Sequence, residues 1–240
     1  AQINVSGLYA AAGNMSNSDF LSGNDRFTNL TGKVTNYGTI RGGSIHLMGQ
    51  RVANYGDISV NGGVMTMLAG EKVVIREVIG QVLVEIDGKK LIEGGPASSP
   101  GDVSLAANPG VDNAGQIDAQ GGQAVLGAGD MYSLAVRNSG SVESAGGDVK
   151  VAALHGAVHN TGELSASVAS GQAGNVQVQA PAIANEGAIT ADAAHGQARQ
   201  TRVLATDRLV LADGSRVSAA GLTSADGGTV IVNTLDGHSY

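Results

Sequence analysis

Short segments in which apolar residues alternate with small or polar residues recur along most of the chain. In Ile45-His46-Leu47 and in Val149-Lys150-Val151, for example, every second side chain is aliphatic. Because successive side chains of a strand point to opposite faces, this pattern predicts short β-strands with one face inward and the other toward water. Asparagine and glycine recur between these segments, and we expect them to form the bends between strands.

The bends follow a repeated motif, Asn-x-Gly-x followed by Ile, Val or Leu. Successive copies of the motif begin 18, 59, 25, 22 and 25 residues apart. The candidate corner residues are Asn36, Gly38, Asn54, Gly56, Asn113, Gly115, Asn138, Gly140, Asn160, Gly162, Asn185 and Gly187. Several copies continue into a Gly-Gly pair and a second alternating segment. We expect the asparagine and glycine of each motif to take the left-handed backbone conformation that a sharp corner needs.

The repeat predicts the architecture. A unit of about 20 residues cannot bury its own apolar face, but stacked units bury it together and form a solenoid. We therefore predict one all-β domain over residues 1–240, with an interior column of Val, Ile, Leu and Ala. A leucine-rich-repeat solenoid is a poor alternative because its LxxLxLxxN string does not occur. A β-sandwich stays open, although it does not require the same corner to recur.

Two segments depart from the repeat. Residues 72–87 contain two β-branched runs around Gly80, which predicts an extra hairpin or pair of strands, followed by a surface loop over residues 88–102. Residues 190–208 are also irregular, and their alanine-rich part is either a short helix or a long loop between coils.

Composition narrows the class of protein. Apolar residues make up 42% of the chain but aromatic residues only 3%, so the core is built from small side chains. The net charge of −7 gives a surface that repels nucleic acid. There is no cysteine, which excludes disulfides and thiolate metal sites. No segment is apolar over a length that spans a bilayer. The chain opens without a signal peptide, so either the mature form starts here or the ends were cut.

Some residues are candidates for enzymatic chemistry, and the same residues also have a plain structural interpretation. Parallel β-helices host polysaccharide lyases and hydrolases, which need converging carboxylates; Asp118, Glu143, Asp148 and Glu163 are the candidates here. A solvated acidic face is the simpler interpretation, because a fold alone does not confer a function. The prediction is therefore no enzyme and no cofactor.

Other motifs have weak signals. His155 and His159 are four residues apart, which would place them on one face only in a helix, so we expect no metal site. The Gly127–Asp130 string GAGD lacks the repetition of calcium-binding nonapeptides and is interpreted as a turn. Glycosylation sequons occur at Asn4, Asn14 and Asn29, and chance occurrence is the favoured interpretation.

Several strings resemble a known family. INVSGL at Ile3, SNSDFL at Ser16, the paired repeats at Asn36 and Asn54, and the stretch Val82 to Asp87 look like the haemagglutination-activity domain of filamentous-haemagglutinin-type two-partner-secretion exoproteins. The resemblance is strongest over residues 1–90, and residues 91–240 resemble the looser β-helical repeats that follow. The family's Asn-Pro-Asn-Gly string is absent, which predicts that the chain begins inside that domain.

The resemblance implies a right-handed parallel β-helix that is secreted or displayed on the cell surface after export through the periplasm of a Gram-negative-type bacterium. It implies an outer-membrane transporter as partner, and adhesion to host or neighbouring cells, or aggregation, as the role. A second hypothesis is a self-assembling filament subunit, because open solenoid ends can stack end to end as a homo-oligomer.

Overall fold

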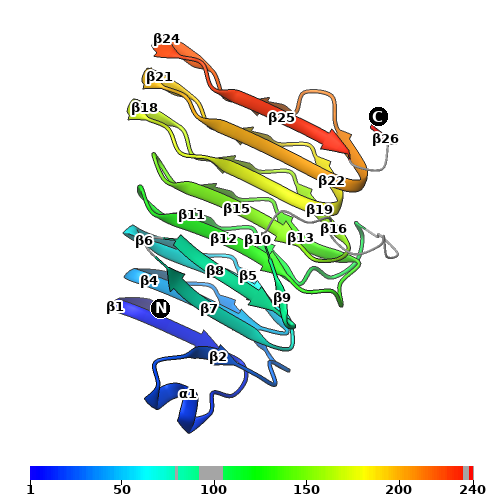
Figure 1. The fold of residues 1–240 in the computed structure, drawn as a ribbon. Coiled ribbons are helices and arrows are strands. Elements are labelled where there is room, and N and C mark those ends of the chain that lie inside the picture. The colour runs from blue at the N-terminus through cyan, green and yellow to red at the C-terminus, as the bar shows by residue number, and fades with distance from the viewer. Residues whose placement is uncertain (79–80, 92–104, 235–237, 240) are drawn as a thin grey trace.

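A computed structural model shows that the chain folds as a parallel β-helix whose coils stack in chain order (Figure 1). The structure describes residues 1–78, 81–91, 105–234 and 238–239. Within these residues, 19 strands belong to one continuous hydrogen-bonded sheet, and the pairings in it are parallel. Crossovers between parallel strands of one sheet are right-handed in nearly all proteins, so a right-handed course is the expected one for this helix. The predicted all-β solenoid is confirmed.

Each coil has three faces. The first face is formed by strands that end at the Asn-x-Gly asparagine: β3 (Lys33–Asn36), β5 (Arg51–Asn54), β10 (Val111–Asn113), β13 (Leu134–Asn138) and β16 (Ala157–Asn160). The second face is formed by short strands after that corner: β11 (Gln116–Asp118), β14 (Ser141–Glu143), β17 (Glu163–Ser165), β20 (Ala188–Thr190) and β23 (Arg216–Ser218).

The third face is formed by β12 (Gln123–Ala128), β15 (Asp148–Ala153) and β25 (Thr229–Thr234). Four longer strands bend around a corner and contribute to two faces: β4 (Thr39–Gly49), β6 (Asp57–Ala69), β19 (Val176–Asn185) and β22 (Gln200–Leu211). At the ends of the described stack, β1 (Gln2–Ala11) pairs with β4, and β26 (His238–Ser239) pairs with β22.

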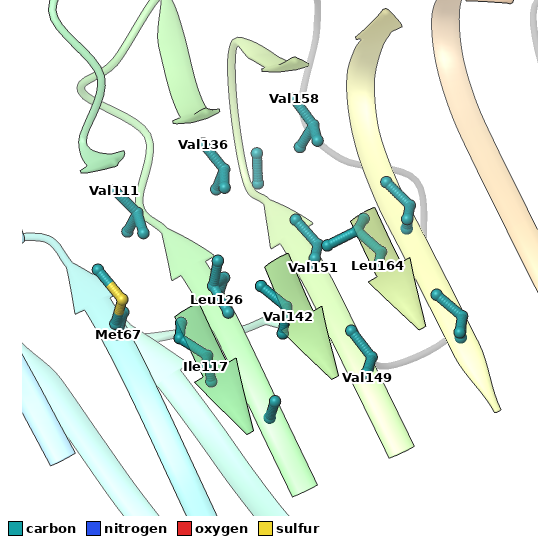
Figure 2. Close-up of a cluster of buried hydrophobic side chains, with 14 of the residues drawn as sticks. Met67, Val111, Ile117, Leu126, Val136, Val142, Val149, Val151, Val158 and Leu164 are labelled. Atoms are coloured by element: carbon teal, nitrogen blue, oxygen red, sulfur yellow. The ribbon is translucent and has the colours of Figure 1, made fainter. Parts of the chain in front are cut away.

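The core consists of aliphatic side chains that stack on the equivalent residue of the next coil. Ile117 pairs with Val142, and Val142 pairs with Leu164. Figure 2 shows this row beside the row of Val111, Val136 and Val158. All six side chains are buried. Because each coil contributes one residue to each row, the repeat places the same small aliphatic types at the same position in every turn.

A second layer covers part of the third face. The segment expected to form a hairpin forms β7 (Val73–Val78) and β8 (Gln81–Ile86), which pair antiparallel. Together with β2 (Asp25–Phe27) and β9 (Lys89–Lys90) they make a four-stranded extra-helical sheet. The hairpin prediction is confirmed, whereas most of the expected loop lies outside the described residues. In Figure 1 this sheet lies in front of β4 and β6.

A flange projects from the later coils. Its strands β18 (Val168–Gln172), β21 (Ala193–Gln197) and β24 (Gly221–Asp226) form a separate three-stranded parallel sheet at one edge of the solenoid (Figure 1). The expectation that the alanine-rich part of residues 190–208 is a short helix or a long loop is therefore wrong. Those residues form strands because each pairs in register with the coil before it, which outweighs the helix propensity of alanine.

Helical structure is minor in the described part of the chain. The helix α1 (Asn17–Leu21) is five residues long, and Ser16 caps it by accepting a hydrogen bond from the Asp19 amide at 3.0 Å. None of the described helices has the length and apolar character that a membrane crossing requires.

Candidate functional site

The Asn-x-Gly asparagines form a buried ladder. Each Nδ2 donates to the Oδ1 of the asparagine in the next coil, from Asn36 to Asn185, at distances of 2.9, 2.9, 2.8, 2.8 and 2.7 Å. The side chains are at most 8% exposed. Several also bond to the backbone of a corner, as when the Asn36 side chain accepts from Gly38 N and donates to Gly38 O. A buried amide needs such partners, because an unsatisfied polar group is costly away from water.

The physical reason predicted for this motif is wrong. The left-handed conformation occurs at none of its asparagines or glycines, namely Asn36, Gly38, Asn54, Gly56, Asn113, Gly115, Asn138, Gly140, Asn160, Gly162, Asn185 and Gly187. Glycine is needed there because the coils approach closely: a Cβ on Gly115 would lie 2.1 Å from the carbonyl oxygen of Gly56. Left-handed glycines occur elsewhere, among them the first glycine of three Gly-Gly pairs, with φ of +71° at Gly62, +76° at Gly121 and +78° at Gly146.

The extra-helical sheet creates a second core on the outside of the solenoid. Phe27, Ile75 and Ile86 from this sheet pack against Met48 and Leu68, which point outward from β4 and β6. His46 lies in the same outward-facing column and is 0% exposed. The expectation that this side chain points to water is wrong, because the alternation places it outside the coil but a second layer then covers it.

His46 is held as a neutral imidazole. Its Nδ1 lies 3.0 Å from Thr66 Oγ1, and its ring centroid lies 4.6 Å from that of Tyr9. Its Nε2 has no hydrogen-bond partner. Burial lowers the pKa of His46 from 6.5 to about 4, against the opposing charge of Asp25. Asp25 in turn accepts a hydrogen bond from Tyr9 Oη at 2.8 Å, so the first coil and the extra-helical sheet are joined here.

A chain of side-chain contacts follows the first face. Tyr37 and Tyr55 stack with ring centroids 5.2 Å apart, and Tyr55 Oη donates to Asp112 at 3.0 Å. Arg137 donates from Nε and Nη2 to the two oxygens of Asp112 at 2.9 and 2.7 Å. The hydrogen bond with Asp112 raises the pKa of Arg137, while burial and the same carboxylate raise the pKa of Tyr55. These contacts join adjacent coils and leave Asp112 fully paired.

Three of the four candidate catalytic carboxylates lie near one another on the second face of the solenoid. Asp118 and Glu143 are register neighbours. Partial burial raises the pKa of Glu143, and the charges of Glu163 and Asp118 add to this shift. Asp148 belongs to another face, where it accepts from Asn175 N at 3.1 Å and Asn175 Nδ2 at 2.9 Å. Asp118, Glu143 and Glu163 therefore lie together, whereas Asp148 is hydrogen-bonded on another face.

The remaining candidates have ordinary surroundings. His159 pairs with Glu186 at 2.9 Å, and no cluster of three or more potential ligands able to hold a metal ion occurs in the part of the chain that the structure describes. The GAGD string ends at a turn, where Asp130 pairs with Lys89 at 3.1 Å. The sequon residues Asn4, Asn14 and Asn29 are all exposed, and their glycosylation stays untested.

The buried, hydrogen-bonded carboxylate of Asp192 was not predicted from the sequence. Asp192 is 6% exposed and accepts from Ser218 Oγ and Ala220 N, both at 2.6 Å, besides pairing with Arg216. Its partners come from the next coil, so local sequence does not reveal them. Its isolated position between Ala191 and Ala193 is the one hint that a carboxylate faces a packed environment there.

The comparison with solved structures supports this fold. No protein-family model and no curated protein matches the chain. Among solved structures, the chain is similar to the HMW1 secretion domain from Haemophilus influenzae, with a TM-score of 0.54 and 20% identity. The match covers 98% of this chain and 74% of that chain. At this identity the likeness establishes a shared fold.

Proposed function

We propose that the chain acts as the secretion domain of a two-partner-secretion exoprotein, which an outer-membrane transporter exports to the cell surface or the medium. The observation that carries this proposal is the fold shared with the HMW1 secretion domain over 98% of the chain. The strings that resemble filamentous-haemagglutinin-type exoproteins support the same class. Within the chain, residues 1–90 are the proposed secretion-domain-like part, and residues 91–240 are further coils.

The topology suits a chain that folds as it leaves a transporter. Each coil pairs with the coil before it, so the helix can grow in chain order by local contacts and needs no external energy. The extra-helical sheet interrupts the repeat, and we propose it as the surface that the transporter recognises. Its outer side carries the exposed Arg76, which lies 3.6 Å from Glu85.

An export assay tests the proposal. The chain is expressed behind a general secretion signal, with and without each member of a panel of two-partner-secretion transporters. We expect transporter-dependent appearance in the medium, and reduced export when Arg76 and Glu85 are replaced by alanine. A matched pair of exposed charges on the solenoid, Asp57 and Lys33, serves as the control. Retention of folded chain in the periplasm with every transporter would contradict the proposal.

The proposed role after export is adhesion to host or neighbouring cells, without catalysis. Binding of fluorescently labelled chain to cell monolayers, with loss of binding in competition with unlabelled chain, is the expected result. Analytical ultracentrifugation over a concentration series distinguishes this role from the alternative, end-to-end assembly into filaments. Growth into fibres with concentration would favour the filament, and a rod-shaped monomer at every concentration would contradict it.

A further inference from the structure

The outward-facing side of the third face is divided into a covered part and an open part. Under the extra-helical sheet, outward side chains such as Met48, Leu68 and Val125 are buried and apolar. Farther along the solenoid, β15, β19 and β22 lie side by side without this layer in Figure 1. Several of their outward positions are polar, among them Lys150, Gln177 and Arg202, so the open part is a distinct surface.

Six polar side chains line a hollow on this open part. The registers place Lys150 beside Gln177, and Gln177 beside Arg202. Asp148, Asn175 and Gln200 form a second column next to them, and the hollow between the columns has a volume of about 210 Å³. The two columns run along the solenoid axis, because the residues of each column come from successive coils.

The two cations of the hollow have no partner of their own. Within the described ranges, the side chains of Lys150 and Arg202 make no ion pair or hydrogen bond, and the buried Nε of Arg202 lacks an acceptor. Arg137 shows how a guanidinium of this solenoid binds a carboxylate, since its Nε and Nη2 donate to the two oxygens of Asp112. Asp148, the carboxylate in the hollow, is already bonded to Asn175. The free groups therefore suit an incoming carboxylate.

The spacing of the cations suits a polymer. Lys150 and Arg202 are two coils apart, and strands are spaced by about 4.8 Å, so about 10 Å separates the two backbone positions along the axis. A disaccharide unit of an extended polysaccharide has a comparable length. Amide side chains such as Gln177, between the cations, can donate to and accept from hydroxyl and acetamido groups.

We propose that this hollow binds a linear polysaccharide with carboxylates on alternate sugars, laid along the solenoid axis. Lys150 and Arg202 bind successive carboxylates, and the amide side chains bind the sugars between them. A weakly charged polymer is favoured over a densely sulfated one, because the whole chain carries a net charge of −7. The proposal is independent of export, since it concerns the folded chain.

Titration calorimetry on the purified chain tests this site, with unsulfated hyaluronan oligosaccharides as the probe. Chitin oligosaccharides of equal length supply the uncharged comparison, and heparin the densely charged one. We expect hyaluronan to bind more tightly than either. Lys150→Gln and Arg202→Gln should each weaken binding at least fivefold, and Arg202→Lys should weaken it less than Arg202→Gln.

Lys33→Gln, which removes an exposed cation from β3 on another face, is the matched control and should change affinity less than twofold. Circular dichroism and thermal melting verify that each variant folds. The proposal is overturned if hyaluronan does not bind the folded chain, if chitin oligosaccharides or heparin bind at least as tightly, or if Lys33→Gln weakens binding as much as the hollow variants. The proposal is also overturned if a protein partner binds this surface with the same affinity for the hollow variants as for the original chain, and hyaluronan does not compete with that partner.

Discussion

Replacing Asn113 by alanine removes a rung from the middle of the asparagine ladder. The Asn113 side chain accepts from Asn54 at 2.9 Å, and it donates to Asn138 Oδ1 at 2.8 Å and to Ser141 O at 3.1 Å. The residue is 0% exposed, so water cannot replace these partners. The substitution therefore deletes two buried hydrogen bonds and a third, partly buried one, and leaves the Oδ1 of Asn138 without its donor.

The expected loss of stability follows from these contacts. A buried hydrogen bond contributes about 1 kcal/mol net, and an acceptor left unpaired costs about 1 kcal/mol or more. We expect Asn113→Ala to lower the free energy of unfolding by about 4 kcal/mol. The end of the ladder supplies a graded comparison. Asn185 accepts from Asn160 and donates to Gly187 O, and its register partner in the next coil is Leu211, so Asn185→Ala should cost about 2 kcal/mol.

Equilibrium denaturation in urea measures both variants, and native-state hydrogen exchange shows whether the loss spreads beyond the neighbouring coils. The exposed Asn24→Ala is the control and should change stability by less than about 0.5 kcal/mol. A cost for Asn113→Ala below about 1 kcal/mol, or one no greater than for Asn185→Ala, would show that the ladder does not stabilise the stack.

Three further predictions concern other contacts. Gly122→Ala should prevent folding or cost more than about 3 kcal/mol, since its Cβ would lie 1.9 Å from a carbonyl oxygen of the preceding coil. In Gly62→Ala the added Cβ meets no atom within 4 Å, so this variant should cost about 1 kcal/mol, for its left-handed backbone alone. Urea titrations compare the stability of the two variants. The lowered pKa of His46 means that the unfolded chain gains this proton near pH 6.5 and the folded chain only near pH 4. Stability should therefore fall as pH drops from 6.5 toward 4, by up to about 3 kcal/mol, and His46→Gln should flatten this slope. Arg137→Ala leaves the buried Asp112 carboxylate without its cation and should cost about 3 kcal/mol at pH 7, which the same urea titrations measure.

The sequence by itself determined the architecture. Alternation at period two predicts strands, and the recurrence of Asn-x-Gly predicts stacked coils, because both are local patterns that repeat wherever the chain turns. The hairpin after Lys72 was predictable for the same reason, as two β-branched runs lie next to each other in the chain. The motif also marks strand ends, because β3 ends at Asn36 and β5 at Asn54.

The tertiary structure alone decided what those residues do. Asn54 and Asn113 are 59 residues apart, yet they bond directly because the intervening chain leaves the solenoid as the extra-helical sheet and returns to it. The same excursion buries His46, whose local pattern is that of a surface residue. The strands within residues 190–208 were likewise missed, because their hydrogen bonds go to neighbouring coils. Contacts between coils depend on register, and register is a property of the whole stack and not of any one segment.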